Sequence, residues 1–139
     1  MVLGQRSLDN LKGIHPDLVK VMKTAITDCP VDFTITNGVR TLQQQKDLYA
    51  QGRTKPGSKV TNADGVKSKS NHQVKADGYG YAVDLYPYVK GSVDLNDKGD
   101  NLKVIAAHIL ATAKCLGIKV TWGGNFKSLV DKPHFELTK

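Results

Sequence analysis

The sequence predicts an α+β fold, in which a small antiparallel sheet is flanked by helices. Two segments, residues 16–29 and 102–116, repeat apolar side chains at the spacing of one helix face. Four shorter apolar segments are bounded by Gly or Pro, as strands commonly are: 31–35, 81–86, 118–122 and 134–137. This mixture of helices and short strands is the basis of the fold assignment.

Prolines mark both ends of the first predicted helix. Pro16 suits a first helical turn, and Pro30 ends the helix. The apolar face of this helix contains Leu18, Val21, Met22, Ala25 and Ile26. In the next segment, 31–35, apolar side chains alternate and predict a strand: Val31, Phe33 and Ile35.

A turn and a second helix follow that strand. The Asn-Gly pair at 37–38 turns the chain and places Arg40 just before a helix predicted from about 41 to 51, with Gly52 as its cap. Residues 53–79 are rich in Gly, Lys, Asn, Ser and Asp and have no period. They predict a long loop, and long loops in small domains are often functional.

The C-terminal half contains the longest predicted helix and three strands. In the strand at 81–86, Ala82 and Asp84 should share one face and oppose Val83 and Leu85. The apolar stripe of the helix contains Leu102, Ile105, Ile109, Ala113 and Leu116, and Gly117 is its cap.

The polar segment at 93–101 is predicted to be a turn that caps the long helix. Part of it, Asp94 to Asp100, resembles a calcium loop. However, Lys98 stands at a ligand position, and Ile105 stands where a bidentate Glu is required. We therefore expect a capped turn there.

Composition indicates a single globular domain spanning residues 1–139. The chain is 40% apolar and 24% charged, and its length allows a core that needs no disulfide. No apolar run is long enough to predict a membrane span. The N-terminal sequence MVLGQRSLDNLKG lacks the pattern of a secretory signal peptide, so we expect synthesis in the cytoplasm.

The net charge of +7 indicates an acidic partner. Nucleic acid and the anionic polymers of a bacterial wall both fit this charge. An aromatic content of 6%, with basic residues spread along the chain, disfavours a platform for stacked bases, and we expect no nucleic acid. Cys29 and Cys115 are isolated and are expected to be buried free thiols.

Two histidine–carboxylate clusters carry the chemistry of this sequence. The first combines SNH at 70–72 with GYAVD at 80–84, and the second is DKPH at 131–134. They supply two imidazoles, one carboxylate ligand and a further carboxylate beside the last histidine. A catalytic zinc site needs three protein ligands and an open position for water. An unligated carboxylate can then accept the proton of that water.

These motifs resemble a known family. SNHQVKADGYGYAVDLYP at 70–87 resembles the signature of zinc D-alanyl-D-alanine peptidases, which include vancomycin-resistance dipeptidases and phage endolysins that cut the L-alanyl–D-glutamate bond of peptidoglycan. DKPHFEL at 131–137 resembles the second signature, and GVRTLQQQKDLYAQGRTKPG at 38–57 resembles a block of the endolysin branch. The resemblance implies a Hedgehog/D-alanyl-D-alanine peptidase-like fold.

The resemblance also implies roles for five residues. His72, Asp84 and His134 match the ligands of one zinc ion per chain. Asp131 matches the general base, and Arg40 matches a catalytic arginine that contacts the substrate carbonyl.

Some positions depart from the family pattern or have open roles. Residues 75–79 lengthen the usual spacing between the first two ligands and are predicted to be an insertion. Tyr81 replaces an expected His or other polar residue, and it is a candidate substrate-binding residue. Ser70 is another such candidate, or it forms the loop locally. His15 and His108 are expected to be structural.

Glu136 competes with Asp131 for the role of general base. Alternation along a strand would put Glu136 on the same face as His134. In that arrangement Glu136 would instead orient a zinc ligand from behind.

The resemblance implies an endolysin, a zinc-dependent peptidoglycan endopeptidase that hydrolyses the L-alanyl–D-glutamate bond and lyses the host. It would act as a monomer on the cell wall, after a separate membrane-permeabilising protein releases it. The alternatives are a D-alanyl-D-alanine carboxypeptidase, a non-catalytic wall-binding zinc module and a basic nucleic-acid binder.

Overall fold

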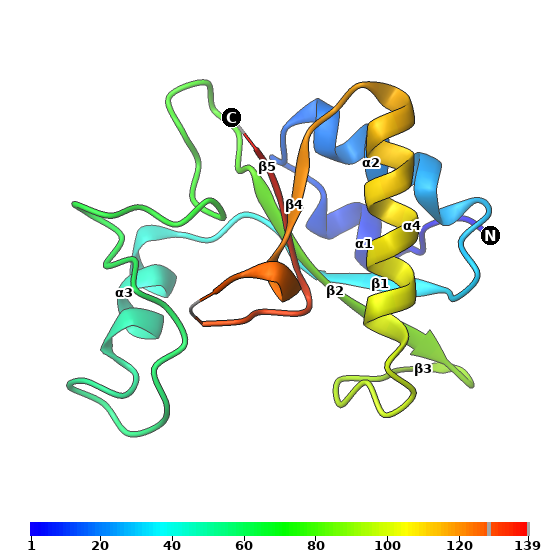
Figure 1. The fold of residues 1–139 in the computed structure, drawn as a ribbon. Helices are drawn as coiled ribbons and strands as arrows, with labels where there is room; N and C mark the ends of the chain where they lie inside the picture. Colours follow the sequence, from blue (N-terminus) through cyan, green and yellow to red (C-terminus); the bar gives the residue numbers. More distant parts are fainter. Residues whose placement is uncertain (128, 139) are drawn as a thin grey trace.

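The computed structural model describes residues 1–127 and 129–138. Figure 1 shows its helices and strands. In chain order they are α1 (Gln5–Asn10), α2 (Pro16–Ile26), β1 (Phe33–Asn37), α3 (Leu42–Ala50), β2 (Ala82–Val89), β3 (Ser92–Val93), α4 (Asn101–Leu116), β4 (Val120–Trp122), the short 3-10 helix η1 (Gly123–Asn125) and β5 (His134–Leu137).

The strands form one antiparallel sheet, which confirms the predicted α+β fold. Their order is β1-β2-β5-β4, and β3 pairs with the far end of β2. In this register Asp84 on β2 lies opposite Asn37 on β1 and opposite His134 on β5. Two residues of the predicted site are therefore neighbours across the sheet.

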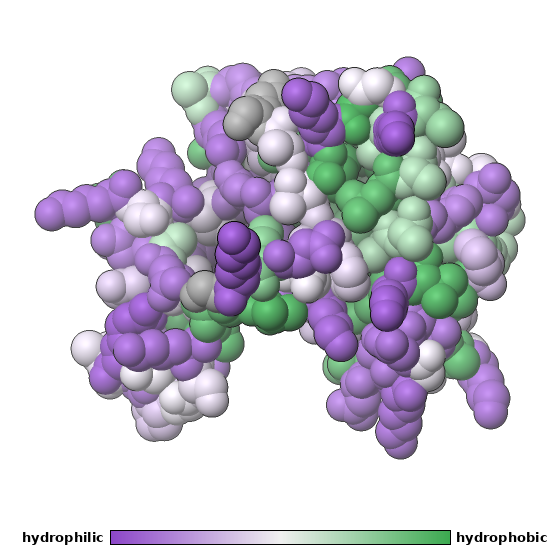
Figure 2. Space-filling model, viewed as in Figure 1, coloured by the Kyte–Doolittle hydropathy of each residue, from purple (hydrophilic) through white to green (hydrophobic). Residues whose placement is uncertain are grey.

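Helices and loops cover the sheet unequally. Figure 1 shows α1, α2 and α4 on one side of the strands and α3 with the long loop on the other. Figure 2 shows a largely hydrophilic surface that is hollowed between the lobe carrying α3 and the rest of the molecule. Within the described residues, every helix is too short or too polar to cross a membrane.

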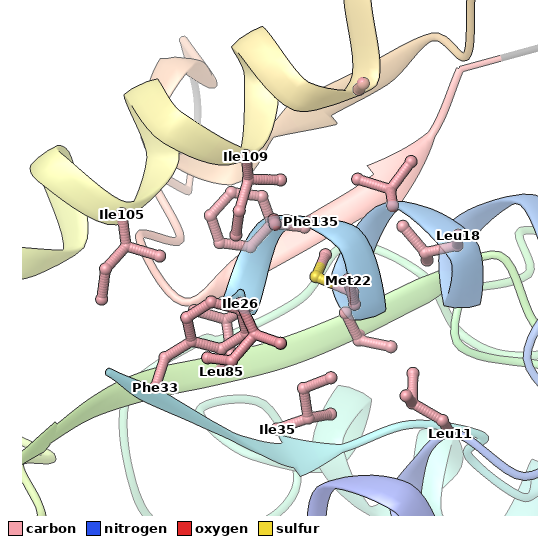
Figure 3. Close-up of a cluster of buried hydrophobic side chains, with 14 of the residues drawn as sticks. Leu11, Leu18, Met22, Ile26, Phe33, Ile35, Leu85, Ile105, Ile109 and Phe135 are labelled. Carbon is pink, nitrogen blue, oxygen red and sulfur yellow. The ribbon is translucent and has the colours of Figure 1, made fainter. Parts of the chain in front are cut away.

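The core lies between the sheet and helices α2 and α4 (Figure 3). Helix α4 directs Ile105 and Ile109 inward, toward Phe135 of β5, and all three side chains are fully buried. Close packing of this kind resists displacement of the strands. The core therefore holds β2 and β5, the strands that carry Asp84 and His134, in a fixed relation.

Alternation along β2 follows the prediction. Val83 and Leu85 belong to the core, whereas Asp84 points to the opposite side of the sheet. Phe135 on β5 is paired with Val83 and is also in the core, so His134 and Asp84 emerge together on the other face.

Several element boundaries differ from those predicted. The short α1 was not predicted, because six residues are too few to show a helical period. It packs beside β1, where Ser7 Oγ accepts a hydrogen bond from the N–H of Ile35 at 2.9 Å. The first strand begins at Phe33 rather than Val31, because its pairing with β2 starts there. The short strand β3 was not predicted either, and it overlaps the predicted polar turn at Val93.

The ends of helices α3 and α4 agree with local signals in the sequence. Thr41 and Gln44 form a capping box at the start of α3, immediately after Arg40. The carboxylate of Asp97 accepts hydrogen bonds from the first N–H groups of α4, so the predicted cap is confirmed. Gly117 ends α4 with a φ of +72°.

The cysteine prediction is half correct. Cys29 and Cys115 are both free thiols, and Cys29 is buried as expected. Cys115 is exposed instead, because it lies on the solvent side of α4, away from the apolar stripe.

Candidate metal centre

Three predicted ligands meet where neighbouring strands of the sheet end. Asp84 and His134 are paired across β2 and β5, and His72 reaches them from the long loop. One ligand atom from each lies within 4.8 Å of the others, and all three residues are buried. The resemblance of the motifs to the family signatures implied this set, and the strand pairing explains how residues distant in sequence converge.

Hydrogen bonds determine which nitrogen each histidine turns toward the centre. His72 Nδ1 lies 3.0 Å from the carbonyl oxygen of Gly38, which can only accept, so this nitrogen carries the proton. His134 Nε2 lies 2.6 Å from Glu136 Oε1 and donates to it. The remaining nitrogens, His72 Nε2 and His134 Nδ1, face each other at 3.1 Å. Metal-binding histidines commonly have such a partner on the second nitrogen.

The carboxylate of Asp84 completes the centre. Its Oδ1 lies 3.4 Å from His72 Nε2 and 3.5 Å from His134 Nδ1. This oxygen is buried and makes no hydrogen bond with any of the described residues. Three lone-pair donors aimed at one point are costly to bury unless a proton or cation lies among them. Two imidazoles and a carboxylate fit a zinc ion well.

The ionisation of the groups at this centre also indicates that a positive charge is stabilised there. Burial raises the pKa of Asp84, but the adjacent imidazoles of His134 and His72 outweigh it and hold that pKa well below its usual range. Burial lowers the pKa of His134, but the adjacent carboxylates of Asp84 and Glu136 outweigh it and raise that pKa to about 9. A proton therefore binds tightly at the position where a metal ion would replace it.

Arg40 lies beside the centre, at the turn between β1 and α3. Its backbone N–H donates to the carbonyl of His72 at 2.8 Å, which ties the arginine to the ligand loop. Its Nη2 is 3.9 Å from Asp84 Oδ2, and its Nη1 is 3.4 Å from Ser70 Oγ. The guanidinium is thus close to the three candidate ligands and is not itself one of them.

Asp131 lies near the nitrogen of His134 that faces the other two candidate ligands, with its Oδ2 3.9 Å from His134 Nδ1. Burial and the nearby charge of Asp84 raise the pKa of Asp131. Its backbone N–H donates to Gly123 O at 2.9 Å. A side chain at Gly123 would place its Cβ 2.2 Å from Asp131 O, so only glycine allows this approach.

Glu136 contacts the nitrogen of His134 that points away from the other ligands. Its Oε1 accepts from His134 Nε2, and its Oε2 accepts from Asn71 Nδ2 at 2.7 Å. The predicted sharing of one strand face by His134 and Glu136 is confirmed. Asn71, which sequence analysis did not select, fixes the second oxygen of this carboxylate.

The centre opens into a cleft of about 930 Å³. Ser70, Asp131 and Arg40 line it, together with parts of α3, the loop from residue 60 and Phe126. Ser70 also shapes the loop, since its Oγ accepts from the N–H of His72 at 3.1 Å. Two of the predicted substrate-binding residues, Arg40 and Ser70, therefore line the cleft.

Tyr81 is not among the described residues that line the cleft. Its ring packs edge-on against His15, and its hydroxyl donates to Asp77. Alternation along the chain turns Tyr81 away from the face that carries Asp84, and its role in substrate binding stays a prediction. His15 also accepts from the N–H of Asp17, at the start of α2, and is structural as predicted.

Sequence analysis also missed Gln45 on α3. Its amide is fully buried and bonds to Arg40 Nη1 and to the loop that forms one wall of the cleft. Three consecutive glutamines occupy 43–45, and nothing in that run distinguishes the buried one. Only the packing of α3 against the loop identifies it.

A family model described as phage L-alanyl-D-glutamate peptidase matches residues 1–138. The chain belongs to this family. It is 37% identical over 132 residues to the peptidoglycan L-alanyl-D-glutamate endopeptidase CwlK of Bacillus subtilis strain 168, covering 89% of this chain and 73% of CwlK. It is 34% identical over 128 residues to the L-alanyl-D-glutamate peptidase of Escherichia phage T5, covering 92% of this chain and 83% of the phage protein.

Solved structures agree with this assignment. The L-Ala D-Glu endopeptidase ChiX of Serratia marcescens matches with a TM-score of 0.77 and 31% identity, over 99% of this chain and 90% of ChiX. The vancomycin-resistance D,D-dipeptidase VanXYg matches with a TM-score of 0.55 and 17% identity, over 89% of this chain and 50% of VanXYg, and so shares the fold. The predicted D-alanyl-D-alanine peptidase-like fold is confirmed.

Deleting residues 75–79 is expected to leave the metal centre intact. The segment forms a local turn, in which the N–H of Lys75 donates to the carbonyl of Tyr79 at 2.9 Å. None of its residues lines the cleft. The deletion removes the bond between Asp77 and Tyr81, so stability should fall by about 1–2 kcal/mol. Metal analysis and thermal unfolding measure the two effects. A folded deletion variant that no longer binds zinc would show that this segment determines ligand geometry.

Proposed function

We propose that the protein is a zinc-dependent endopeptidase that hydrolyses the L-alanyl–D-glutamate bond of peptidoglycan stem peptides. The observation that carries the proposal is the meeting of His72, Asp84 and His134 in a cleft that also contains Arg40 and Asp131. Membership of the L-alanyl-D-glutamate peptidase family supports the choice of bond.

His72, Asp84 and His134 would hold the zinc ion, with one ion per chain. When bound, zinc lowers the pKa of a water ligand toward neutrality and polarises a carbonyl group. Gly38 O and Glu136 keep the two imidazoles in the tautomers that leave one lone pair each for the metal. The buried, unpaired oxygen of Asp84 supplies the negative ligand.

Asp131 would act as the general base. Its carboxylate lies in the cleft, on the side of His134 that faces the other ligands, and its raised pKa strengthens it as a proton acceptor. It would take the proton of the attacking water and deliver it to the leaving amino group of D-glutamate. Glu136 is hydrogen-bonded to the opposite nitrogen of His134. This contact favours a role for Glu136 in orienting His134 over the role of general base.

Arg40 would bind the substrate carbonyl. Its guanidinium lies at the cleft surface, 3.9 Å from the Asp84 carboxylate. As the carbonyl oxygen gains negative charge, an N–H group already aimed at it would stabilise that charge. Ser70, which contacts the same guanidinium, would border the substrate at this point.

A digest of purified peptidoglycan tests the bond choice. Mass spectrometry should find new N-termini on D-glutamate and new C-termini on L-alanine, and a chelator should abolish both products. Release of D-alanine as the main product would assign the protein as a carboxypeptidase instead. Wall binding without any cleavage by the zinc-loaded protein would assign a non-catalytic module, and salt-dependent DNA affinity that persists after zinc removal would assign a nucleic-acid binder.

Raising the salt concentration is expected to weaken lysis of whole walls more than cleavage of a small soluble stem peptide. The net charge of +7 favours an anionic wall, and salt screens charges that lie farther apart than about 8–10 Å at physiological ionic strength. Chemistry inside the cleft depends on closer contacts. Parallel assays of walls and a stem peptide, from low to high salt, measure the two responses. If salt slowed both reactions equally, long-range electrostatic attraction would not contribute to wall binding.

The cellular setting follows from this function. We propose that the protein acts as a monomer on the wall during host lysis, after another protein permeabilises the membrane. Its synthesis in the host cytoplasm would keep it from the wall until that moment.

A further inference from the structure

The side chain of Gln45 is an unusual feature of the cleft, because it is a polar group with an exposed fraction of 0%. It extends from α3, and its Oε1 accepts a hydrogen bond from Arg40 Nη1 at 2.8 Å. Its Nε2 donates to Ala63 O at 2.7 Å and lies 3.3 Å from Thr61 Oγ1. The amide is therefore satisfied on both ends, as a buried polar group must be.

The partners of this amide leave it one orientation. Arginine can only donate, and a backbone carbonyl can only accept. The oxygen of Gln45 must then face Arg40, and its nitrogen must face Ala63. A side chain with only one of these two functions could not join both partners.

The bond to Gln45 is also the shortest side-chain contact of Arg40. Ser70 Oγ lies 3.4 Å from Arg40 Nη1, and Asp84 Oδ2 lies 3.9 Å from Nη2. A free guanidinium beside a buried carboxylate would move to form a close ion pair with it. Such a pair would occupy the N–H groups of Arg40 and would draw on the charge of a metal ligand.

We propose that Gln45 is a positioning residue, which holds the Arg40 guanidinium away from Asp84 and ties it to the wall of the cleft at residues 61–63. This inference rests on the proposed role of Arg40 toward the substrate. Because the Gln45 amide bonds both to Arg40 and to the loop at residues 61–63, it would couple the orientation of the guanidinium to the position of that loop.

The test compares Gln45→Met with Gln43→Met. Both changes replace a glutamine of α3 by a residue of similar length, but Gln43 is exposed and bonds only to Asp47 among the side-chain partners described for it. Gln45→Met should lower kcat/KM for a soluble stem peptide by roughly tenfold or more, the effect of losing one bond to a charged group. Most of the loss should appear in kcat, and Gln43→Met should match the wild type.

A double-mutant cycle with Arg40→Ala separates positioning from general damage. If Gln45 acts through Arg40, adding Gln45→Met to Arg40→Ala should change kcat/KM by less than about twofold. A full tenfold loss in both backgrounds would overturn the proposal. Bound zinc should stay unchanged in every variant, since no ligand is altered.

Two measurements that do not depend on turnover complete the design. Nitrogen NMR of the Arg40 guanidinium should show faster rotation of the Nη groups in Gln45→Met, and trypsin should cut faster after Lys59, Lys67 or Lys69. Unchanged rotation of the Nη groups would refute the proposal about Gln45. Failure of the wild type to cleave a stem peptide would reject only the proposed function, and the NMR measurement would still test the role of Gln45. If Gln45→Met does not fold, Gln45→Glu is tested instead, because its carboxylate can still accept a hydrogen bond from Arg40. We expect slow rotation of the Arg40 Nη groups in Gln45→Glu, and fast rotation in that variant would also refute the proposal.

Discussion

Replacing His134 with alanine is expected to abolish both zinc binding and cleavage of the stem peptide. The variant keeps only two ligands, His72 and Asp84, whereas a catalytic zinc site needs three. Apparent zinc affinity should fall by more than the roughly 10–100-fold that is typical for loss of a partner outside the ligand set. Metal analysis and mass spectrometry of the digest measure the two losses together.

His108→Ala is the matched control for this variant. His108 is a histidine on α4 that bonds to Ala25 O at 2.9 Å and to Asp28, far from the ligands in the fold. This variant should retain its zinc and its activity, apart from a modest loss of stability. A His134→Ala protein that keeps a full equivalent of zinc, or a verified metal-free wild type that cleaves at the normal rate, would contradict the metal assignment.

Replacing Asp131 with asparagine is expected to lower kcat by about 10²–10⁴-fold, the usual contribution of a general base. Asparagine has nearly the same shape, and the backbone bond from Asp131 N–H to Gly123 O is kept. Asp131 is not one of the three ligands that meet at the centre, so zinc should remain bound. Steady-state kinetics on a soluble stem peptide, with metal analysis of the same sample, measures both quantities.

Glu136→Gln distinguishes the base from its competitor. The amide oxygen of glutamine can still accept from His134 Nε2, but its amino group would face the donor Asn71 Nδ2. We expect weaker zinc binding, by about 10–100-fold, and near-normal turnover once zinc is saturating. If Asp131→Asn stayed active while Glu136→Gln were inactive with zinc bound, the two roles would be reversed.

Much of the fold was predictable because its signals are local. The apolar stripes of α2 and α4 lie within single helices, and both helices were located from them. The cap formed by Asp97 and the ending of α4 at Gly117 depend on neighbours within a few residues. Short elements such as α1 and β3 carry too few residues for a period, so their existence depends on what they pack against.

The sequence by itself determined the identity of the three candidate ligands, because their residue types and motif spacing are properties of the chain. The tertiary structure decided their chemistry. His72 meets Gly38 across 34 positions, and Asn71 meets Glu136 across 65, so no local pattern encodes these contacts. The same applies to Gln45, whose two identical neighbours in sequence face elsewhere, and to Tyr81, which the chain turns out of the cleft. Strand pairing and close packing bring such residues together, and they act only once the whole domain has folded.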